Sequence, residues 1–472
     1  MNDITSLSEF IENRIYSEIN VGDKAVLTRT LHPEDIQLFA IMSGDVNPAH
    51  VDPEYARSSM FHEVIAHGMW GAALISTVLG TEFPGPGTIY ISQTLRFSRP
   101  VKVGDTMTVT ITCKQKFDHN NHMILDCICT NQDGMKVISG EAEVLAPLQK
   151  IKRARMAMPA LTISDRDARH RKLLAKSKDL TPVLTAFAHP VDLESLNMAV
   201  AARDIGAMVP VLVGPEAHIR ALAEQNSLDL NGCRFVDVPY SREAARRAVA
   251  MAASGEVEAL VQGSQRTDEL LHSIIAAGGL RTTRRISHVL YIDVQTYPHP
   301  LFITDTLVNI DPSLKDKVDI VQNAIDFAHM MGVAEPKVAL LAAIETVTPK
   351  MRATTDAAAL CKMADRRQIT GAVLDGPLGF DNAVSMASAR QQGIRSLVAG
   401  QADVLVAPDL ESANMLAKQF EHLSDAVSGG IAMGARVPIV LLNRSDSQDN
   451  RVASCALAQF AAHRQRTDKS LL

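Results

Sequence analysis

The stretch Ser43-Gly44-Asp45-Val46-Asn47-Pro48-Ala49-His50 is a short polar turn between two segments with helical signals. Pro48 fixes its own φ and disfavours the helical region for Asn47, so the chain has to bend here. The bend can bring the Asp45 carboxylate and the His50 imidazole to one point, where such a pair can hold and deprotonate a water molecule. The alternative is an aspartate that caps the next helix beside a surface histidine.

A helix and an antiparallel sheet are expected on the carboxyl side of this turn. The run 70–79 is almost entirely apolar and too short to cross a membrane, which predicts a helix buried on all sides. Free amide groups at its start, near Gly68, can polarise a carbonyl oxygen. Alternating strands are expected over 87–97, 105–117, 122–130 and 136–145. The sequence therefore predicts a sheet wrapped round one helix.

Four blocks in this part of the chain carry a resemblance to a known family. They are the turn 43–50, the motif Ala66-His67-Gly68-Met69, and the segments 84–90 and 99–105. In this order they resemble the MaoC-like, R-specific enoyl-CoA hydratases over roughly residues 20–147. The resemblance implies an α+β hotdog fold, in which an antiparallel sheet cradles a long helix, and it implies a dimer.

The same resemblance implies roles for five residues. Asp45 and His50 would hold and activate the water that adds across the 2,3 double bond of an enoyl-CoA. The Gly68 amide would hold the thioester oxygen, Ser76 would line the acyl pocket, and Asn47 would belong to the substrate-binding residues. Some hotdog domains only bind acyl-CoA or dimerise, and this alternative stays open.

Composition limits the class of protein. The 472 residues suffice for two or three domains, and a net charge of −6 with one tryptophan argues against a nucleic-acid-binding surface. The six cysteines have neither metal-ligand nor paired spacing, and no apolar run has membrane length. Residues 1–4 do not suggest a signal peptide. We therefore expect reduced thiols in a cytoplasmic protein without a bound metal.

The character of the sequence changes after residue 147. The predicted parts are a hotdog domain over 1–147, a linker over 148–180 and a second domain over 181–472. Residues 1–19 are expected to form a short helix or a loose arm, and the basic run 150–155 a solvated face or hinge. After residue 180 strands and helices alternate, which predicts a parallel sheet covered by helices on both faces. The usual motifs of ATP and NAD binding do not occur.

Polar turns follow four strands of the predicted second domain. Ligands of open α/β sheets lie at the carboxyl ends of strands, so the turns 304–309, 375–382, 408–414 and 443–447 predict a shared cleft. Each turn taken alone is also what a helix cap requires. The candidate ligands in the first three turns are Thr304, Asp305, Asn309, Asp375, Asp381 and Asn414.

Arginines provide the candidate phosphate ligands. Arg444 follows an apolar strand, and a planar guanidinium can bind phosphate through two hydrogen bonds. The alternative for Arg444 is an ion pair with Asp446 or Asp449. Arg281 and Arg284, with the neighbouring Arg285, form a second basic cluster, which either meets the phosphates of coenzyme A or is solvated.

The second half of the chain resembles the phosphate acetyl/butyryltransferases over about residues 180–465. The blocks that carry this resemblance are 301–305 with Asn309, 316–324, 362–365, 374–381, 408–414 and 436–440. The resemblance implies an α/β fold of two subdomains, similar to isocitrate and isopropylmalate dehydrogenases, with the active site between them. It also implies a dimer and the transfer of an acyl group between coenzyme A and phosphate.

Three catalytic assignments follow from this second resemblance. Arg444 matches the family arginine that contacts phosphate or the transition state. Asn443 stands where acetyl-specific members have serine, and its amide can still donate to a developing oxyanion. The family's aspartate base falls on Asn450 by direct counting, so Asp449 beside it becomes the candidate base.

Together the two resemblances imply a bifunctional, homo-oligomeric acyl-CoA enzyme. Its substrates would be enoyl-CoA, acyl-CoA and phosphate, and neither reaction needs a metal or redox cofactor. Two alternatives remain, namely a transferase with a non-catalytic hotdog domain and an acyl-CoA-responsive regulator with decayed sites. Asn443 is the feature that favours the regulator.

Overall fold

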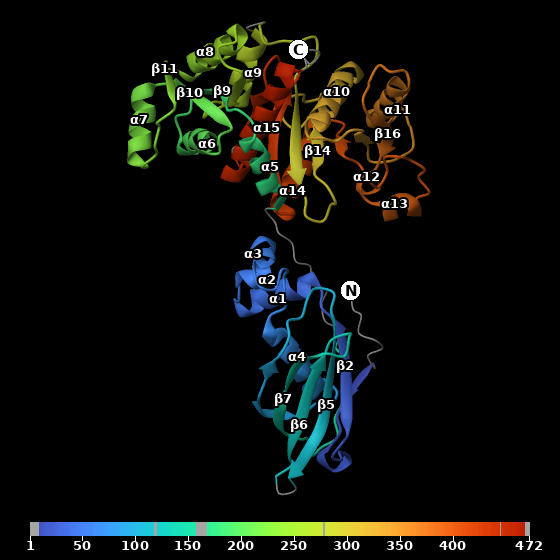
Figure 1. The fold of residues 1–472 in the computed structure, drawn as a ribbon. Coiled ribbons are helices and arrows are strands. Elements are labelled where there is room, and N and C mark those ends of the chain that lie inside the picture. Colours follow the sequence, from blue (N-terminus) through green and yellow to red (C-terminus); the bar gives the residue numbers. More distant parts are fainter. Residues whose placement is uncertain (1–8, 118–119, 157–167, 277–278, 444, 468–472) are drawn as a thin grey trace. The chain divides into compact units, whose positions relative to one another are not determined.

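The computed structural model describes residues 9–117, 120–156, 168–276, 279–443 and 445–467. The chain divides into two compact units, Met1–Ser164 and Asp165–Leu472, each with its own sheet and core (Figure 1). The division falls inside the predicted linker. None of the helices in the described ranges is long and apolar enough to cross a membrane. All six cysteines are free thiols.

The sheet of the first unit is antiparallel. Its strand order is β2 (Lys24–Thr30), β5 (Thr106–Phe117), β6 (His122–Thr130), β7 (Lys136–Leu145) and β3 (Ile89–Gln93), and β4 (Arg96–Phe97) also pairs with β7. Buried and partly exposed side chains alternate along β5 and β6, so one face of the sheet is covered. Helix α4 (Gly68–Thr81) packs on that face through Trp70, Leu74 and Val78. This is the expected hotdog arrangement.

Helix α4 differs from its prediction in one respect. In this chain one of its sides is exposed, and Met69, Ser76 and Thr77 lie on it. The expectation of burial on all sides is therefore wrong for the single chain. The reason is that most bulky apolar residues occupy one stripe of the helix, whereas the opposite stripe carries small or polar ones apart from Met69.

The segments that flank the first unit pair with each other. Strand β1 (Phe10–Glu12) is antiparallel to β8 (Lys152–Ala154), and a 3₁₀ turn, η1 (Tyr16–Glu18), follows β1. The described part of 1–19 is thus a strand and a turn. The basic run is largely exposed, as expected of a solvated face, and it forms ion pairs from Lys150 to Glu18 at 2.8 Å and from Arg155 to Glu82 at 3.0 Å. These ion pairs attach the run to the first unit beyond residue 147.

The second unit is built on an 11-stranded sheet. In spatial order its strands are β11 (Arg234–Asp237), β10 (Met208–Gly214), β9 (Val183–Ala188), β12 (Ala259–Gln262), β19 (Ile439–Val440), β18 (Val427–Met433), β13 (Ser287–Asp293), β14 (Leu301–Thr304), β17 (Val404–Val406), β15 (Lys337–Leu341) and β16 (Val373–Leu378). Two parallel blocks are separated by antiparallel pairings at the centre of the sheet. These pairings are β19 with β18, β18 with β13 and β13 with β14. The two blocks run in opposite directions.

The predicted parallel pairing is confirmed within each block, and antiparallel strands interrupt it at the centre of the sheet. Parallel neighbours need a crossover of a dozen or more residues. The connections 294–300, between β13 and β14, and 434–438, between β18 and β19, are shorter than that. Both connections consequently form antiparallel returns.

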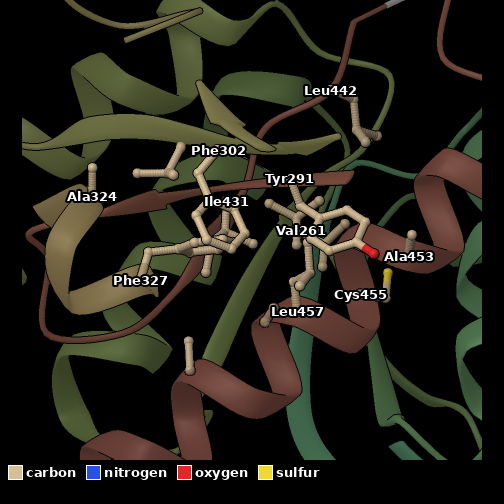
Figure 2. Packing of buried hydrophobic residues seen from close by; sticks show 14 of the residues in the cluster. Val261, Tyr291, Phe302, Ala324, Phe327, Ile431, Leu442, Ala453, Cys455 and Leu457 are labelled. Carbon is tan, nitrogen blue, oxygen red and sulfur yellow. The ribbon is translucent and has the colours of Figure 1, made fainter. Parts of the chain in front are cut away.

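Helices cover this sheet and its core. They are α5 (Ala168–Lys178), α6 (Leu193–Asp204), α7 (Glu216–Gln225), α8 (Ser241–Ser254), α9 (Thr267–Ala276), α10 (Leu314–Met330), α11 (Arg352–Asp365), α12 (Phe380–Val384), α13 (Met386–Gln391), α14 (Leu410–Leu423) and α15 (Gln448–Thr467). Figure 2 shows Phe302 of the sheet with Phe327 of α10 and Leu457 of α15. Helix α5 belongs to this unit, because Leu173 joins the same core and Ser177 donates a hydrogen bond to Gln459.

Three short helices surround the polar turn of the first unit. They are α1 (Pro33–Ser43), α2 (Pro48–Val51) and α3 (Pro53–Ser58). Each begins with proline at its first position, where the missing N–H has no helical partner to lose. The turn 44–47 therefore lies between two fixed helix ends.

Candidate active sites

Local capping explains the shape of the turn in the first unit. Helix α1 ends at Gly44, whose φ of 75° is the left-handed conformation that glycine adopts without strain. Asn47 caps α2 by accepting a hydrogen bond from the Ala49 amide at 3.1 Å. Asp45 accepts one from the Asn47 amide at 3.2 Å and remains exposed. The cap is therefore Asn47, and the Asp45 carboxylate is presented at the surface of the turn.

The turn brings Asp45 and His50 together, and a third residue joins them. Ligand atoms of Asp45, His50 and His67 all lie within 4.8 Å of one another. The rings of the two histidines have centroids 4.0 Å apart. His67 is buried, with 2% of its surface exposed.

Backbone carbonyls fix which nitrogen of each ring carries the proton. His50 Nδ1 lies 2.9 Å from the Ile65 carbonyl oxygen, and His67 Nε2 lies 2.9 Å from the Asp45 carbonyl oxygen. A carbonyl oxygen only accepts, so these two nitrogens are the donors. In the neutral rings, Nε2 of His50 and Nδ1 of His67 keep their lone pairs. Both can therefore accept a proton or bind a cation.

A cavity of about 330 Å³ adjoins the two rings. His50, His67 and Gly68 line it, and its walls are otherwise largely apolar, with Phe97, Met107 and Ile138 among them. Gly68 is the first residue of α4, where backbone amides have no partner within the helix. The site therefore combines a proton acceptor, a free helix terminus and room for an acyl chain.

Three predicted residues of this unit are not among those that line the cavity, namely Asp45, Asn47 and Ser76. Ser76 is on the exposed side of α4, and Asn47 caps α2. Conversely, His67 was not predicted as a site residue, although it belongs to the motif Ala66-His67-Gly68-Met69 that carries the resemblance. The contact that brings His67 into the site spans 22 positions. No local pattern reports a contact of that kind.

The second unit has a cleft of about 860 Å³. One side consists of residues that follow β9, β12 and β19, namely Asp192, the segment 263–267 and Asn443. The other side consists of 307–310 and Leu410. Carboxyl ends of parallel strands are where open α/β sheets bind ligands. The structure thus brings three of the four predicted turns to one cleft and leaves 375–382 outside it.

Three predicted ligands of this unit are buried behind the cleft wall. Asp305 accepts hydrogen bonds from the amides of Leu307 and Val308, each at 3.1 Å, and from Asn309. Burial raises the pKa of Asp305. Thr304 donates to the carbonyl of His288 at 2.9 Å. These side chains hold the loop 305–309, and Leu307 and Val308 are the loop residues that reach the cleft.

The other predicted ligands have protein partners. Asn414 donates to the Thr306 carbonyl at 3.3 Å and so supports the same loop. Asp375 accepts from the Gly376 amide at 2.8 Å, and Asp381 accepts from Ser388, near the edge strand β16. Asp375 and Asp381 are far from Asn443 because five strands separate the edge strand β16 from β19, namely β18, β13, β14, β17 and β15.

The second basic cluster also lies away from the cleft. Arg284 forms an ion pair with Asp326, and Arg285 forms one with Asp316 at 3.0 Å. Arg281 is bridged to Ala435 through its backbone, and Arg284 lines a separate small hollow. Acidic residues on α10 therefore satisfy two of these charges, which the sequence could not reveal.

Asn443 is the predicted catalytic residue that the structure places in the cleft. Arg444 lies outside the described residues. Asp449 is exposed in the first turn of α15 and is not among the residues that line the cleft. Asp446 is not among the lining residues either, but it contacts the cleft residue Asn443, whose backbone amide donates to it at 2.8 Å. Burial raises the pKa of Asp446, which makes it a better proton acceptor than an exposed aspartate.

Gln265 is a cleft residue that the sequence reasoning missed. It is 6% exposed, and neither atom of its amide group has a hydrogen-bond partner within the described chain. It follows β12 in a tightly packed turn, since a Cβ on Gly263 would collide with the carbonyl of Ala188. An unpaired buried amide is costly. Gln265 therefore favours a ligand that offers both a donor and an acceptor.

These observations define a protein of two enzyme-like units, a hotdog unit with an Asp–His site and an α/β unit with a cleft at strand ends. The chain matches the model of the MaoC like domain over residues 17–128 and that of the phosphate acetyl/butaryl transferases over residues 239–459. It is 52% identical over 300 residues to a phosphate acetyltransferase of Rhizobium meliloti, which covers 63% of this chain and 95% of that protein. The chain belongs to the phosphate acetyl/butyryltransferase family, and its first unit is a MaoC-like domain.

Solved structures resemble each unit. A branched-chain phosphotransacylase from Enterococcus faecalis V583 is 26% identical, with a TM-score of 0.53, and covers 60% of this chain and 99% of that chain. The second unit thus has the phosphotransacylase fold. An R-hydratase from Pseudomonas aeruginosa is 44% identical and covers 33% of this chain and 99% of that chain, with a TM-score of 0.32.

Proposed function

We propose that the protein is a bifunctional acyl-CoA enzyme. The second unit transfers an acyl group between coenzyme A and inorganic phosphate, and the first unit hydrates an enoyl-CoA to a 3-hydroxyacyl-CoA. Membership in the transferase family supports the first activity. The observation that carries the second is the meeting of Asp45 and His50 beside a largely apolar cavity of about 330 Å³.

Hydration needs a proton acceptor, a polarised thioester and an apolar pocket. The free lone pair on His50 Nε2 accepts a proton from water while the Asp45 carboxylate orients that water. The oxygen bonds to C3, and the proton passes to C2 from the protonated acceptor. The Gly68 amide, at the start of α4, stabilises the negative charge on the thioester oxygen.

Acyl transfer needs a base, an oxyanion donor and a phosphate ligand. In the direction of acyl-CoA formation, the base accepts the thiol proton, the thiolate attacks the acyl phosphate carbonyl and phosphate leaves. Asp446 is the candidate base that its raised pKa favours, and Asp449 is the alternative from the family pattern. The Asn443 amide donates to the oxyanion, and Arg444 holds the phosphate.

Gln265 adds a contact for coenzyme A. The pantetheine arm of coenzyme A contains secondary amides, and each one offers a donor and an acceptor. The two unpaired atoms of the Gln265 side chain therefore suit this arm.

Other parts of this proposal rest on the sequence. They are the likeness of the second fold to isocitrate and isopropylmalate dehydrogenases, the cytoplasmic location and the homo-oligomer. One observation supports assembly, because β3 is an edge strand and exposes Ile89, Tyr90 and Ile91. Long exposed apolar edges are suited to pairing with another chain.

Two assays on the full-length protein test the proposal. Phosphate-dependent release of coenzyme A from acetyl-, propionyl- and butyryl-CoA measures the transferase, and hydration of crotonyl-CoA measures the hydratase. We expect both activities. Transfer without hydration would leave a transferase with a non-catalytic hotdog domain. Loss of both activities with retained acyl-CoA binding would indicate a regulator instead.

A further inference from the structure

The Asp45 site brings together three groups that can each bind a cation. Asp45 contributes a carboxylate, and the two histidines contribute the ring nitrogens that are not bonded to backbone carbonyls. Nδ1 of His67 is buried and has no hydrogen-bond partner among the described residues. Asp45 is exposed and accepts a hydrogen bond from the Asn47 amide, so His67 Nδ1 is the buried acceptor of the three that lacks a partner. A cation can satisfy all three at once.

We infer that this site binds one divalent transition-metal ion, such as Zn²⁺ or Co²⁺, through Asp45, His50 and His67. Two imidazoles and one carboxylate are a common ligand set for such ions. Each imidazole already donates its other N–H to a backbone carbonyl, the outer contact that orients metal-binding histidines in proteins.

The geometry requires little rearrangement. Ligands of a tetrahedral zinc ion at about 2.1 Å stand about 3.4 Å apart. One potential ligand atom from each of the three residues lies within 4.8 Å of the other two. Asp45 is exposed on its turn, so its side chain can rotate toward the buried His67.

Binding of the ion would regulate the first unit. A metal on His50 Nε2 occupies the lone pair that accepts the proton from water in the proposed hydration. Asp45 would be engaged by the same ion. The metal would therefore inhibit hydration of crotonyl-CoA, and a chelator would restore it. The cleft of the second unit uses none of the three residues, so acyl transfer would continue.

Titration of the full-length, chelator-treated protein with Co²⁺ tests this inference independently of activity. We expect one visible absorption band that saturates at one Co²⁺ per chain and is displaced by Zn²⁺. His67→Gln keeps an amide donor for the Asp45 carbonyl, and Asp45→Asn keeps the shape of the exposed side chain. Each should weaken binding by at least about tenfold. His32→Asn is the matched control, because His32 lies in the same unit at the start of α1 and outside the cluster.

Phosphate-dependent release of coenzyme A reports whether each variant is folded in its second unit, and a thermal melt reports on the first. Should His67→Gln unfold, Asp45→Asn on the exposed turn carries the test alone. Absence of saturable Co²⁺ binding, or binding that Asp45→Asn leaves unchanged, would overturn the inference. Metal binding without inhibition would overturn the regulatory part. A failure of the hydratase proposal is distinguishable, because Co²⁺ binding is measured without enoyl-CoA.

Discussion

His67 Nε2 lies 2.9 Å from the carbonyl oxygen of Asp45, 22 positions earlier in the chain. This hydrogen bond ties the residue before α4 to the turn that follows α1. It therefore fixes the start of α4, where Gly68 presents its amide, relative to the Asp45 carboxylate. Together with the hydrogen bond of His50 Nδ1 to the Ile65 carbonyl, it holds the two halves of the proposed hydration site.

Replacement of Asp45 by Asn or of His50 by Gln should abolish hydration and spare acyl transfer. Loss of a positioned proton acceptor lowers the rate by about 10²–10⁴-fold. The measurement is crotonyl-CoA hydration beside phosphate-dependent release of coenzyme A, with His32→Asn as the control. Equal losses of both activities would refute two independent sites.

Replacement of Gln265 by Leu should raise the KM for coenzyme A by about tenfold and leave the KM for phosphate unchanged. Leucine has a similar shape but pairs with no amide of the substrate. Gln225→Leu, at the exposed end of α7, is the control. An increase confined to the KM for phosphate would show that the amide contacts the phosphate instead.

The sequence predicted local structure well where burial follows a short period. The strands β6 and β7 begin and end at the predicted residues, because alternation along a strand records which face is buried. The bend at Pro48 was also predictable, since it depends on proline and its neighbour alone.

Features that depend on distant contacts could not be predicted. The direction of β18 depends on its neighbours in space, and the sequence shows only the length of the connections around it. Gln265 resembles any polar residue of a turn until its burial and its unpaired amide are known. Asp305 was predicted to contact substrate, whereas its hydrogen bonds to Leu307 and Val308 hold the cleft wall.

Replacement of Asn443 by Ala should lower kcat of acyl transfer by about 10²-fold, because one donor to the oxyanion is lost. Asn443→Ser restores the residue of acetyl-specific members and should retain most of the activity. The measurement is kcat with acetyl-CoA and saturating phosphate. The alanine variant keeps the backbone amide that donates to Asp446, so the loop is preserved. Full activity of Asn443→Ala would exclude the side chain from the reaction.

Burial of His288 should make the second unit sensitive to acid. Its ring is enclosed, bonded through Nδ1 to Thr306 at 2.6 Å and packed against Gly430, where a Cβ would collide with it. Desolvation lowers the pKa of His288 from 6.5 to about 3. The unfolded chain therefore binds this proton more readily than the folded one.

The stability that neutral His288 contributes is thus complete above pH 6.5 and is lost as the pH falls from 6.5 toward 3. His288→Gln should be less stable at pH 7.5. Below pH 6.5, however, its free energy of unfolding should fall less steeply with pH, and the slope should be smaller by at most the contribution of one bound proton. Denaturant unfolding of the second unit between pH 7.5 and pH 5 measures this slope, with the exposed His272→Gln as control. Parallel slopes for His288→Gln and the unsubstituted protein would mean that the buried ring does not control the acid response.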